Sequence, residues 1–411
     1  MTEAPAGRKV LYITFDGLTD PLGRSQVLPY LNGLAARGHR ITILSCEKPA
    51  RLEAGRAAVQ EIVDRAGIAW RHVPYRNRPA VLAHAWTVAR LAWQSGRLNR
   101  TCGGFDIVHC RSYPPGIVGL WMKRRFGARF LFDMRGFWPE EKVEGGSWPQ
   151  SRLIYRFVYR ALKRIEDRLF RGADHIVSLT HLGRRIMLQW PRLRGADTRI
   201  TVIPCCVDFD HFPLPSPEKR AEARAALGIG ADAEVMVYLG SLGAWYMPGE
   251  MLDLFRTYAG ARPKAVFLVV TPEPPEQVVA AAAARQIDSG RLVIRAASRE
   301  QVPLFLAAAD LGIFFIQPVP SKAASSPTKM GEMLALGLPT IANAGVGDVS
   351  EILESTGAGV AIETFDEAAY EQAIAAAEGI AIDAAEIRRR ALPWFDVKLG
   401  IDNYDRIYRA L

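Results

Sequence analysis

Short apolar runs alternate with helix-like segments along most of this 411-residue chain, and this alternation limits the possible folds more than any other feature. VLYITF (10–15), RITILS (40–45) and RFLFD (129–133) are typical of buried strands, and the pattern resumes at EVMVYLG (234–240) and AVFLVV (265–270). Strands that alternate with helices over short connections predict parallel sheets covered on both faces. The fold class is therefore expected to be α/β.

A proline-rich segment, CCVDFDHFPLPSP (205–217), interrupts the alternation. Proline fits neither a helix interior nor a central strand, so we predict a linker there. The predicted organisation is an N-terminal domain over 1–208, a C-terminal domain over 209–391, and a final helical segment over 392–411 that packs back on the N-terminal domain.

Two details of the N-terminal half are also predicted from its composition. A loop over 16–25 and then a helix near 26–37 are expected after the first strand. Residues 134–150 are rich in Trp, Gly and Glu and are expected to form a long loop.

Charge is distributed unevenly along the chain. Residues 1–208 carry 34 Lys and Arg against 17 Asp and Glu, whereas 209–411 carry 18 against 26. A basic half suggests a nucleic acid, an anionic membrane or an anionic substrate as partner. In 78–97 and 151–171, Arg residues recur among apolar and aromatic ones at helical spacing. Such helices either form the core face of a domain or lie on an anionic membrane surface, and we favour the membrane.

Cysteine usage and hydropathy favour a cytosolic protein. No C-x-x-C spacing or zinc-like His cluster is present, so no metal site is expected. No apolar run is long enough to span a membrane, and the first residues show no secretory signal pattern. The thiols expected to be reduced are Cys46, Cys102, Cys110, Cys205 and Cys206.

The stretch SSPTKMGEMLALGLPTIANAGVGD (325–348) is the strongest candidate for a ligand site. Ser326 followed by Pro327 predicts a helix start, because Ser can cap the first turn and Pro needs no N–H there. The amides of Thr328 and Lys329 would then point into the loop. Such a helix end attracts phosphate, and Lys329 adds a full charge.

Two further residues extend this candidate site. Glu332 lies one turn into the helix, within reach of a group attached to the phosphate. Gly347 lies in the turn after the next strand, at the edge of a parallel sheet where ligands usually bind. An ordinary capped helix packed on a sheet is the alternative.

Six motifs carry a resemblance to a known family. In chain order they are DPLGRSQVLPYL, HCRSY, FDMRGFWPEE, IPCCVD, YLGSLGAWY and SSPTKMGEMLALGLPTIANAGVGD. They resemble the retaining GT-B glycosyltransferases of family 4 over nearly the whole chain. The resemblance implies two Rossmann-like domains with parallel sheets facing an interdomain cleft, with acceptor bound by the first domain and nucleotide-sugar by the second. It also implies that no metal or cofactor is needed, because the helix end and basic side chains neutralise the leaving diphosphate.

The donor residues of the family are matched only in part. Of two family glutamates separated by seven residues, the ribose-binding one corresponds to Glu332, while the sugar-binding one corresponds to Ala324. The family's Arg and Lys after the first strand of the second domain are absent from GSLGAWYMPGE. We expect anion binding to come instead from Lys329, Ser326 and Thr328, with the amides of Gly240 and Ser241.

A loop near the N-terminus is predicted to contact the transferred sugar and the acceptor. In Asp20-Pro21-Leu22-Gly23, Pro21 fixes one backbone angle and Gly23 is expected to adopt one that a side chain would block. The resemblance places Asp20 and Gly23 beside the sugar. A plain turn between strand and helix is the alternative.

Polar residues at the ends of two strands complete the predicted site. The family often has His-x-His where this chain has His109 and Arg111. Arg111 cannot act as a base, but it can stabilise an anionic leaving group or bind an acidic acceptor, and His109 is interpreted as structural. Asp133 or Glu140 is the hypothetical proton acceptor. An ion pair between Asp133 and Arg135 is the alternative, and in this family the leaving phosphate itself can take the proton.

The predicted protein is a glycosyltransferase at the cytoplasmic face of the cell membrane. It would transfer a sugar from a nucleotide-sugar to a lipid-linked glycan in surface polysaccharide biosynthesis. One alternative is a GT-B nucleotide-sugar 2-epimerase, which needs no acceptor. The other is a nucleic-acid-binding protein that uses the basic half, although no nucleic-acid motif is present.

Overall fold

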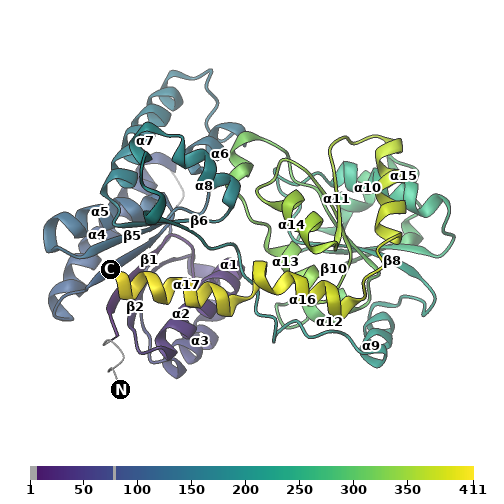
Figure 1. The fold of residues 1–411 in the computed structure, drawn as a ribbon, viewed down its shortest axis with the longest axis horizontal. Helices are drawn as coiled ribbons and strands as arrows, with labels where there is room; N and C mark the ends of the chain where they lie inside the picture. The colour runs from purple at the N-terminus through teal and green to yellow at the C-terminus, as the bar shows by residue number, and fades with distance from the viewer. Residues whose placement is uncertain (1–6, 77–79) are drawn as a thin grey trace. The chain divides into compact units, whose positions relative to one another are not determined.

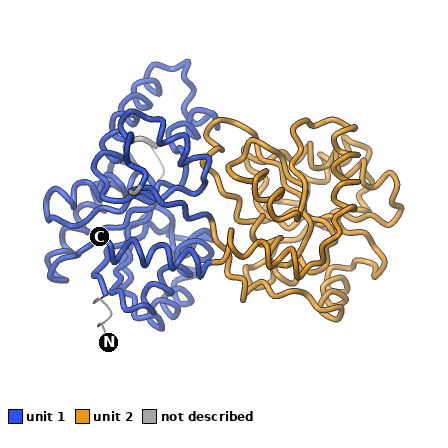
Figure 2. Tube along the Cα trace, in the orientation of Figure 1, with its two compact units in different colours: residues 1–204, 397–411 blue, residues 205–396 orange. Residues whose placement is uncertain are grey.

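The computed structural model describes residues 7–76 and 80–411, and the chain divides into two compact units (Figures 1 and 2). Unit 1 contains the chain up to Pro204 together with Val397–Leu411, and unit 2 contains Cys205–Asp396. The sequence had predicted domain boundaries at residues 208 and 391, within five residues of these limits.

Unit 1 is built on a parallel sheet, as predicted. Among its described residues the sheet has seven strands in the order β3-β2-β1-β4-β5-β6-β7. The order reverses between β1 and β4, and ligands of such sheets bind beyond the carboxyl ends of the strands at this point. The strands are β1 (Lys9–Thr14), β2 (Arg40–Glu47), β3 (Ala69–Pro74), β4 (Ile107–Arg111), β5 (Arg129–Asp133), β6 (His175–Ser178) and β7 (Ile200–Val202).

Helices connect the strands of unit 1, and the C-terminal helix α17 joins them by packing on α2. These helices are α1 (Pro21–Gln26), α2 (Leu28–Ala36), α3 (Pro49–Arg65), α4 (Ala80–Thr101), α5 (Tyr113–Phe126), α6 (Trp138–Glu144), α7 (Leu153–Gly172), α8 (His181–Leu188) and α17 (Val397–Ala410). Two 3-10 turns, η1 (Pro191–Leu193) and η2 (Asp197–Arg199), precede β7.

Unit 2 repeats the same architecture with a smaller parallel sheet. Within the described part its six strands have the order β10-β9-β8-β11-β12-β13, which reverses between β8 and β11. The strands are β8 (Glu234–Leu239), β9 (Ala265–Val270), β10 (Leu292–Arg295), β11 (Leu311–Phe314), β12 (Thr340–Asn343) and β13 (Gly359–Ile362).

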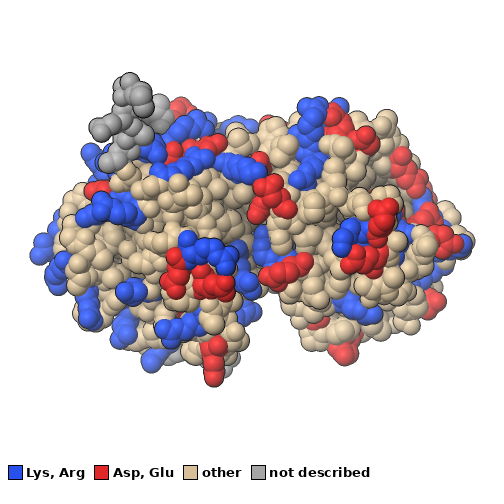
Figure 3. Space-filling model, turned by 90° about the horizontal axis from the view of Figure 1, so that it is seen from below, with Lys and Arg blue, Asp and Glu red and all other residues tan. Residues whose placement is uncertain are grey.

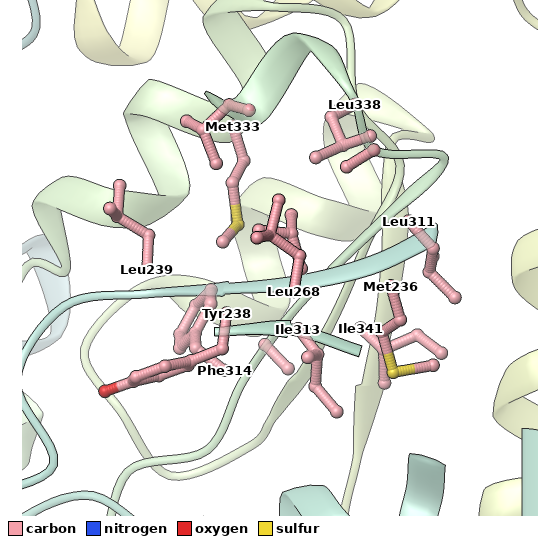
Figure 4. Close-up of a cluster of buried hydrophobic side chains, with 14 of the residues drawn as sticks. Met236, Tyr238, Leu239, Leu268, Leu311, Ile313, Phe314, Met333, Leu338 and Ile341 are labelled. Carbon is pink, nitrogen blue, oxygen red and sulfur yellow. The ribbon is translucent and has the colours of Figure 1, made fainter. Parts of the chain in front are cut away.

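The core of unit 2 is apolar on both faces of its sheet, which explains the continuous apolar runs of its strands. Leu268, Ile313 and Met333 are fully buried in it, and the Tyr238 ring lies at its edge (Figure 4). The helices are α9 (Pro217–Leu227), α10 (Pro248–Gly260), α11 (Pro275–Ala283), α12 (Val302–Ala307), α13 (Thr328–Ala335), α14 (Val349–Thr356), α15 (Glu367–Glu378) and α16 (Ala384–Phe395), with 3-10 turns η3 (Ser289–Arg291) and η4 (Pro320–Ala324).

Several local predictions were wrong. The predicted loop 134–150 contains α6, whose first turn combines Pro139 with Glu140 and Glu141, residues that favour a helix start. The predicted helix near 26–37 corresponds to α2, but the predicted loop 16–25 contains the short helix α1. Strand β13 was missed, because its four residues carry too short an apolar run to stand out.

The predicted linker is also not a free connection. Phe209 and Phe212 are buried in the core of unit 2, and the Val207 amide donates to the Phe395 carbonyl. No helix or regular strand forms over 205–216, and α9 begins at Pro217, but the aromatic side chains of this segment fix it to unit 2.

Unit 1 carries most of the positive charge. On the face drawn in Figure 3, Lys and Arg predominate over unit 1, in keeping with the uneven sequence count. Within the described ranges, no helix is long and apolar enough to cross a membrane.

Gly23 does not have the backbone angle that was predicted for it. It lies inside α1 without a positive φ, and a Cβ at this position would lie 2.1 Å from the Gly17 carbonyl oxygen. We expect Gly23→Ala to destabilise unit 1 by about 3 kcal/mol, because backbone cannot yield to the methyl group. Urea unfolding checks this against Gly260→Ala, where a Cβ meets nothing within 4 Å. Equal stability of the two variants would contradict the predicted clash with the Gly17 carbonyl.

Candidate functional site

Lys329, in the first turn of α13, is buried beneath two tyrosines of unit 2. Its Nζ donates a 3.0 Å hydrogen bond to the Tyr238 hydroxyl, which in turn donates to the Ser241 carbonyl. The same Nζ lies 4.3 Å from the Tyr238 ring centroid and 3.8 Å from that of Tyr246. The ammonium is thus held at the carboxyl end of β8 by one hydrogen bond and two cation–π contacts.

This environment leaves the charge of Lys329 only weakly compensated. Burial lowers its pKa to about 7, and the more distant Glu332 and Glu273 oppose this shift. No carboxylate lies within ion-pair distance of its Nζ in the described parts of the chain. An anionic ligand at this point would therefore stabilise the ammonium strongly.

A second lysine occupies a similar position, and the sequence prediction missed it. Lys322, in η4, is buried, and its Nζ lies 3.8 Å from the ring centroid of Trp245. Trp245 and Tyr246 belong to the loop in which the sequence lacks the family's Arg and Lys. Trp245 contacts Lys322 and Tyr246 contacts Lys329, so this loop lies beside two lysines that come from other elements. The Trp-Tyr pair was the only sign of these contacts in the sequence.

Two predicted anion-binding groups are engaged elsewhere. The Gly240 amide donates to the Val270 carbonyl, so the prediction that it binds an anion was wrong. Gly240 has φ +124°, and a Cβ there would lie 2.9 Å from the Lys329 Nζ, so this glycine makes room for the lysine. Ser326 does not cap the helix, because its Oγ accepts from the Cys205 amide and α13 begins at Thr328.

Gly347 and Ser241 also have defined partners. The Gly347 amide donates to the Lys322 carbonyl, which ties the turn after β12 to η4. Ser241 contributes its carbonyl to the Tyr238 hydroxyl. Both residues therefore shape the lysine site through the backbone.

Glu332 lies one turn beyond Lys329 on α13 and is buried. Burial raises the pKa of this carboxyl, while Arg299 and Lys329 counteract the shift. The Arg299 guanidinium lies 3.5 Å from Glu332 Oε1. Ala324 is fully buried, so apolar packing replaces the first glutamate of the family pattern.

In unit 1, Asp133 at the end of β5 is the centre of a buried polar cluster. The Tyr404 hydroxyl of α17 donates to Asp133 Oδ2 at 3.0 Å. The same oxygen lies 3.8 Å from Arg135, 4.0 Å from Arg111 and 3.7 Å from His109. The structure thus brings together four predicted residues from β4, β5 and the loop after β5, and adds Tyr404, which lies far away in the sequence.

Two arginines determine the electrostatics of this cluster. Burial raises the pKa of Asp133, but Arg135, His109 and Arg111 outweigh it and hold the pKa below its usual value. Arg111 also donates to Asp16 Oδ2 at 3.0 Å. Arg135 has φ +61°, a strained conformation for a residue with a side chain. Asp133 is therefore a carboxylate at neutral pH, and a poor base.

His109 is buried and bound to the C-terminal helix. Its Nδ1 lies 2.7 Å from the Tyr408 hydroxyl, and burial lowers its pKa, so the ring is neutral. His109 Nε2 and Asp133 Oδ1 have no hydrogen-bond partner among the described residues. Both residues line a small cavity together with Tyr12 and Tyr404.

The remaining predicted residues belong to other networks. Glu140 accepts a 2.7 Å hydrogen bond from Lys163 on α7. Asp20 accepts from Lys48 at 3.0 Å and also from Arg51. The structure thus separates Glu140 and Asp20 from the contacts of Asp133.

We expect Tyr404→Phe to lower the free energy of unfolding by about 2 kcal/mol, because its hydroxyl donates to an ionised carboxylate. Tyr30→Phe is the matched control, since the Tyr30 hydroxyl donates at 3.0 Å to the uncharged Pro204 carbonyl. Its loss should be about half as large. Urea unfolding at neutral pH measures both, and a larger loss in the control would contradict the charge-assisted bond.

The chain matches known families over most of its length. Residues 24–206 match the family described as Glycosyl transferase 4-like domain, and residues 219–391 match Glycosyl transferases group 1. The chain belongs to the group 1 glycosyltransferases. This family membership confirms the resemblance read from the sequence.

Curated relatives of this group 1 glycosyltransferase carry one name. The chain is 25% identical over 285 residues to a D-inositol 3-phosphate glycosyltransferase of Nocardioides sp., covering 64% of this chain and 57% of the relative. It is 28% identical over 225 residues to the protein of that name from Kineococcus radiotolerans, covering 51% of this chain and 45% of the relative. The matches thus span less than two thirds of the relatives.

Solved structures share the fold of this group 1 glycosyltransferase. Sucrose-phosphate synthase from Thermosynechococcus elongatus superposes with a TM-score of 0.72 at 17% identity, covering 98% of each chain. Anabaena HepE in complex with UDP and glucose superposes with a TM-score of 0.69 at 14% identity, covering 98% of this chain and 100% of that one. WaaG, a glycosyltransferase involved in lipopolysaccharide biosynthesis, superposes with a TM-score of 0.68 at 15% identity, covering 97% of this chain and 99% of that one. At this identity the similarity establishes the GT-B fold, with two Rossmann-like domains.

Proposed function

We propose that this protein transfers a sugar, with retention of configuration, from a nucleotide-diphosphate sugar to an acceptor hydroxyl. The observation that carries the proposal is the buried ammonium of Lys329, placed at the start of α13 without a carboxylate partner among the described residues. A diphosphate supplies the charge that this site needs. The helix start adds free amides and the positive end of the macrodipole.

The donor is proposed to bind through three features of unit 2. Lys329 contacts the diphosphate, and Lys322 is a second cation near the same loop. Glu332 accepts hydrogen bonds from the ribose hydroxyls. UDP is the first nucleotide to test, since Anabaena HepE was solved with UDP.

The proposed reaction needs no protein base. The acceptor oxygen forms a bond to the anomeric carbon while the bond from that carbon to the diphosphate oxygen breaks. The acceptor proton moves to the departing diphosphate, so charge and atoms balance. Lys329 stabilises the negative charge that grows on the leaving group. Neither a metal nor a cofactor takes part in this proposal.

The acceptor is proposed to carry an anionic group. Arg111 and Arg135 lie within 4.0 Å of Asp133 at the ends of β4 and β5, and Arg111 also pairs with Asp16. A guanidinium group carries five donors and is suited to bind phosphate or carboxylate groups. A lipid-diphosphate-linked glycan fits this requirement, and so does the D-inositol 3-phosphate in the relatives' name.

A substrate panel tests the proposal. Thermal shift with UDP, GDP, dTDP and CMP identifies the nucleotide, and the matching sugars are then supplied with D-inositol 3-phosphate or a lipid-diphosphate sugar. We expect glycosylated product only when acceptor is present. NMR of the product should show that the anomeric configuration of the donor is retained. A changed sugar nucleotide in the absence of acceptor would favour the epimerase, and no nucleotide binding would overturn the donor site.

A further inference from the structure

Five arginines form a ridge along one helix of unit 1. Residues four apart on a helix are neighbours one turn apart, each turned by about 40° from the last, so a row of them winds slowly around the helix. Exposed arginines recur at this interval from the residue before α7 to its last turns, namely Arg152, Arg156, Arg160, Arg164 and Arg168. We call these residues the arginine ridge.

The arginine ridge has no acidic partners within the described ranges. Other cations of α7 are paired: Lys163 contacts Glu140, and Arg171 contacts Asp167 at 2.9 Å. The fold therefore neutralises some cations of this helix and leaves a continuous row unneutralised. Exposed unpaired cations in a row are suited to bind a surface that carries several negative charges.

Large apolar side chains are exposed in the first turns of α7. Leu153, Ile154 and Phe157 are 77%, 61% and 66% exposed, whereas Leu169 and Phe170 near the other end are fully buried. The second half of α7 is thus anchored in unit 1, and its first turns present apolar side chains to the solvent beside the ridge. Clustered exposure of this kind marks an interaction site.

We propose that the first half of α7 docks on an anionic lipid bilayer. Leu153, Ile154 and Phe157 would enter the region between headgroups and acyl chains, while the arginine ridge contacts lipid phosphates. A nucleic acid would use the arginines but gains little from three exposed aliphatic and aromatic side chains.

The sequence predicted membrane contact for two segments, 78–97 and 151–171, which correspond to α4 and α7. The structure favours α7 alone. On α4 the Trp86 ring is covered by the guanidinium groups of Arg76 and Arg90, at 4.4 and 5.1 Å. The exposed Trp93 stands eleven positions from the exposed Leu82, so the two form no patch at the first turn. The membrane inference rests on α7 and is independent of the proposed sugar transfer.

Vesicle sedimentation of the full chain tests the proposal. The vesicles contain phosphatidylcholine alone or with about one third phosphatidylglycerol, at low salt and at about 0.5 M salt. One variant combines Arg156→Gln, Arg160→Gln and Arg164→Gln, and another combines Leu153→Gln, Ile154→Gln and Phe157→Gln. The matched control removes three exposed charges of unit 1 elsewhere: Arg65→Gln, Arg100→Gln and Arg194→Gln.

We expect binding only to the anionic vesicles, weakened about tenfold or more by either α7 variant and little by the control. Unchanged thermal unfolding and unchanged binding of UDP show that the variants remain folded. A Phe157→Trp variant should show blue-shifted emission with anionic vesicles.

Two results would overturn the proposal. The first is equal vesicle binding by the ridge variant and the control. The second is tight, salt-sensitive binding of single-stranded RNA that the ridge variant loses and the apolar variant keeps, without any vesicle binding. Failure of nucleotide binding alone would bear on the donor site and not on this surface.

Discussion

Lys329→Met is expected to weaken UDP binding about a hundredfold while making the free protein more stable at neutral pH. The loss of affinity follows because the substitution removes the cation that faces the diphosphate. The gain in stability follows because the buried ammonium is poorly compensated, and its pKa is lowered to about 7. A change that improves folding and abolishes binding is typical of a site built for a ligand.

The pH dependence of that stability gain has a defined sign. Between pH 7 and the ordinary lysine value of 10.5, the unfolded chain binds a proton that the folded chain does not. Lys329 therefore costs stability most below pH 7, and the cost disappears as the pH approaches 10.5. The variant should be more stable by on the order of 3 kcal/mol at pH 7, since cation–π contacts offset part of the shift.

Lys264→Met is the matched control, since Lys264 is an exposed lysine of unit 2 paired with Asp232. It should leave UDP affinity unchanged. Calorimetric titration measures affinity, and urea unfolding at pH 7 and pH 10 measures stability. Unchanged affinity in Lys329→Met would refute the assignment of this lysine to the diphosphate.

Asp133→Asn is expected to destabilise unit 1 by about 3–5 kcal/mol, the largest effect on folding that we predict. The asparagine keeps the shape but leaves Arg111 and Arg135 without their buried counter-charge. Asp16→Asn is the control, because the Asp16 side chain is 41% exposed and its pair with Arg111 is partly in solvent. Its cost should be about 1 kcal/mol or less.

The contribution of Asp133 to stability should also rise with pH, but in the acidic range, because its pKa is lowered as well. Its pKa lies below the ordinary 3.8, so it contributes full stability above that value. The contribution is lost as the pH falls through the folded-state pKa. Urea unfolding at pH 7 and near pH 3 should show the difference between wild type and Asp133→Asn shrinking at low pH. A difference that grows on acidification would contradict an ionised Asp133.

The activity of the Asp133→Asn variant separates a structural role of Asp133 from a chemical one. Because Asp133 is a poor base in its cluster, we expect residual turnover in Asp133→Asn at temperatures where it remains folded. Complete loss of kcat in a folded variant would instead support the proton-acceptor hypothesis of the sequence.

The fold was predictable because it depends on repeated apolar strands. Runs such as RFLFD and AVFLVV coincide with β5 and β9, since buried parallel strands require continuous apolar residues. Local errors arose where signals are short. Strand β13 has four residues, and α6 is a seven-residue helix inside a segment with many loop-forming residues.

The candidate sites were predictable only as far as local motifs reach. Lys329 and Glu332 lie in one motif, so their helix and spacing could be predicted. The contacts of Lys329 with Tyr238 and Tyr246 join residues from separate elements, and no spacing rule predicts them. Tyr404 reaches Asp133 across 271 positions of the chain. The exposure of Leu153 and Phe157 also depended on knowing which half of α7 is buried.

Proton uptake on nucleotide binding tests the central claim most directly. UDP is titrated at pH 8 in two buffers of different ionisation enthalpy, since its terminal phosphate, with a second pKa of about 6, is already ionised there. Lys329 has a pKa of about 7 without ligand and should regain its proton against the diphosphate. We predict uptake of nearly one proton in wild type and in Lys264→Met. Binding without proton uptake in wild type would contradict a buried Lys329 that pairs with the diphosphate.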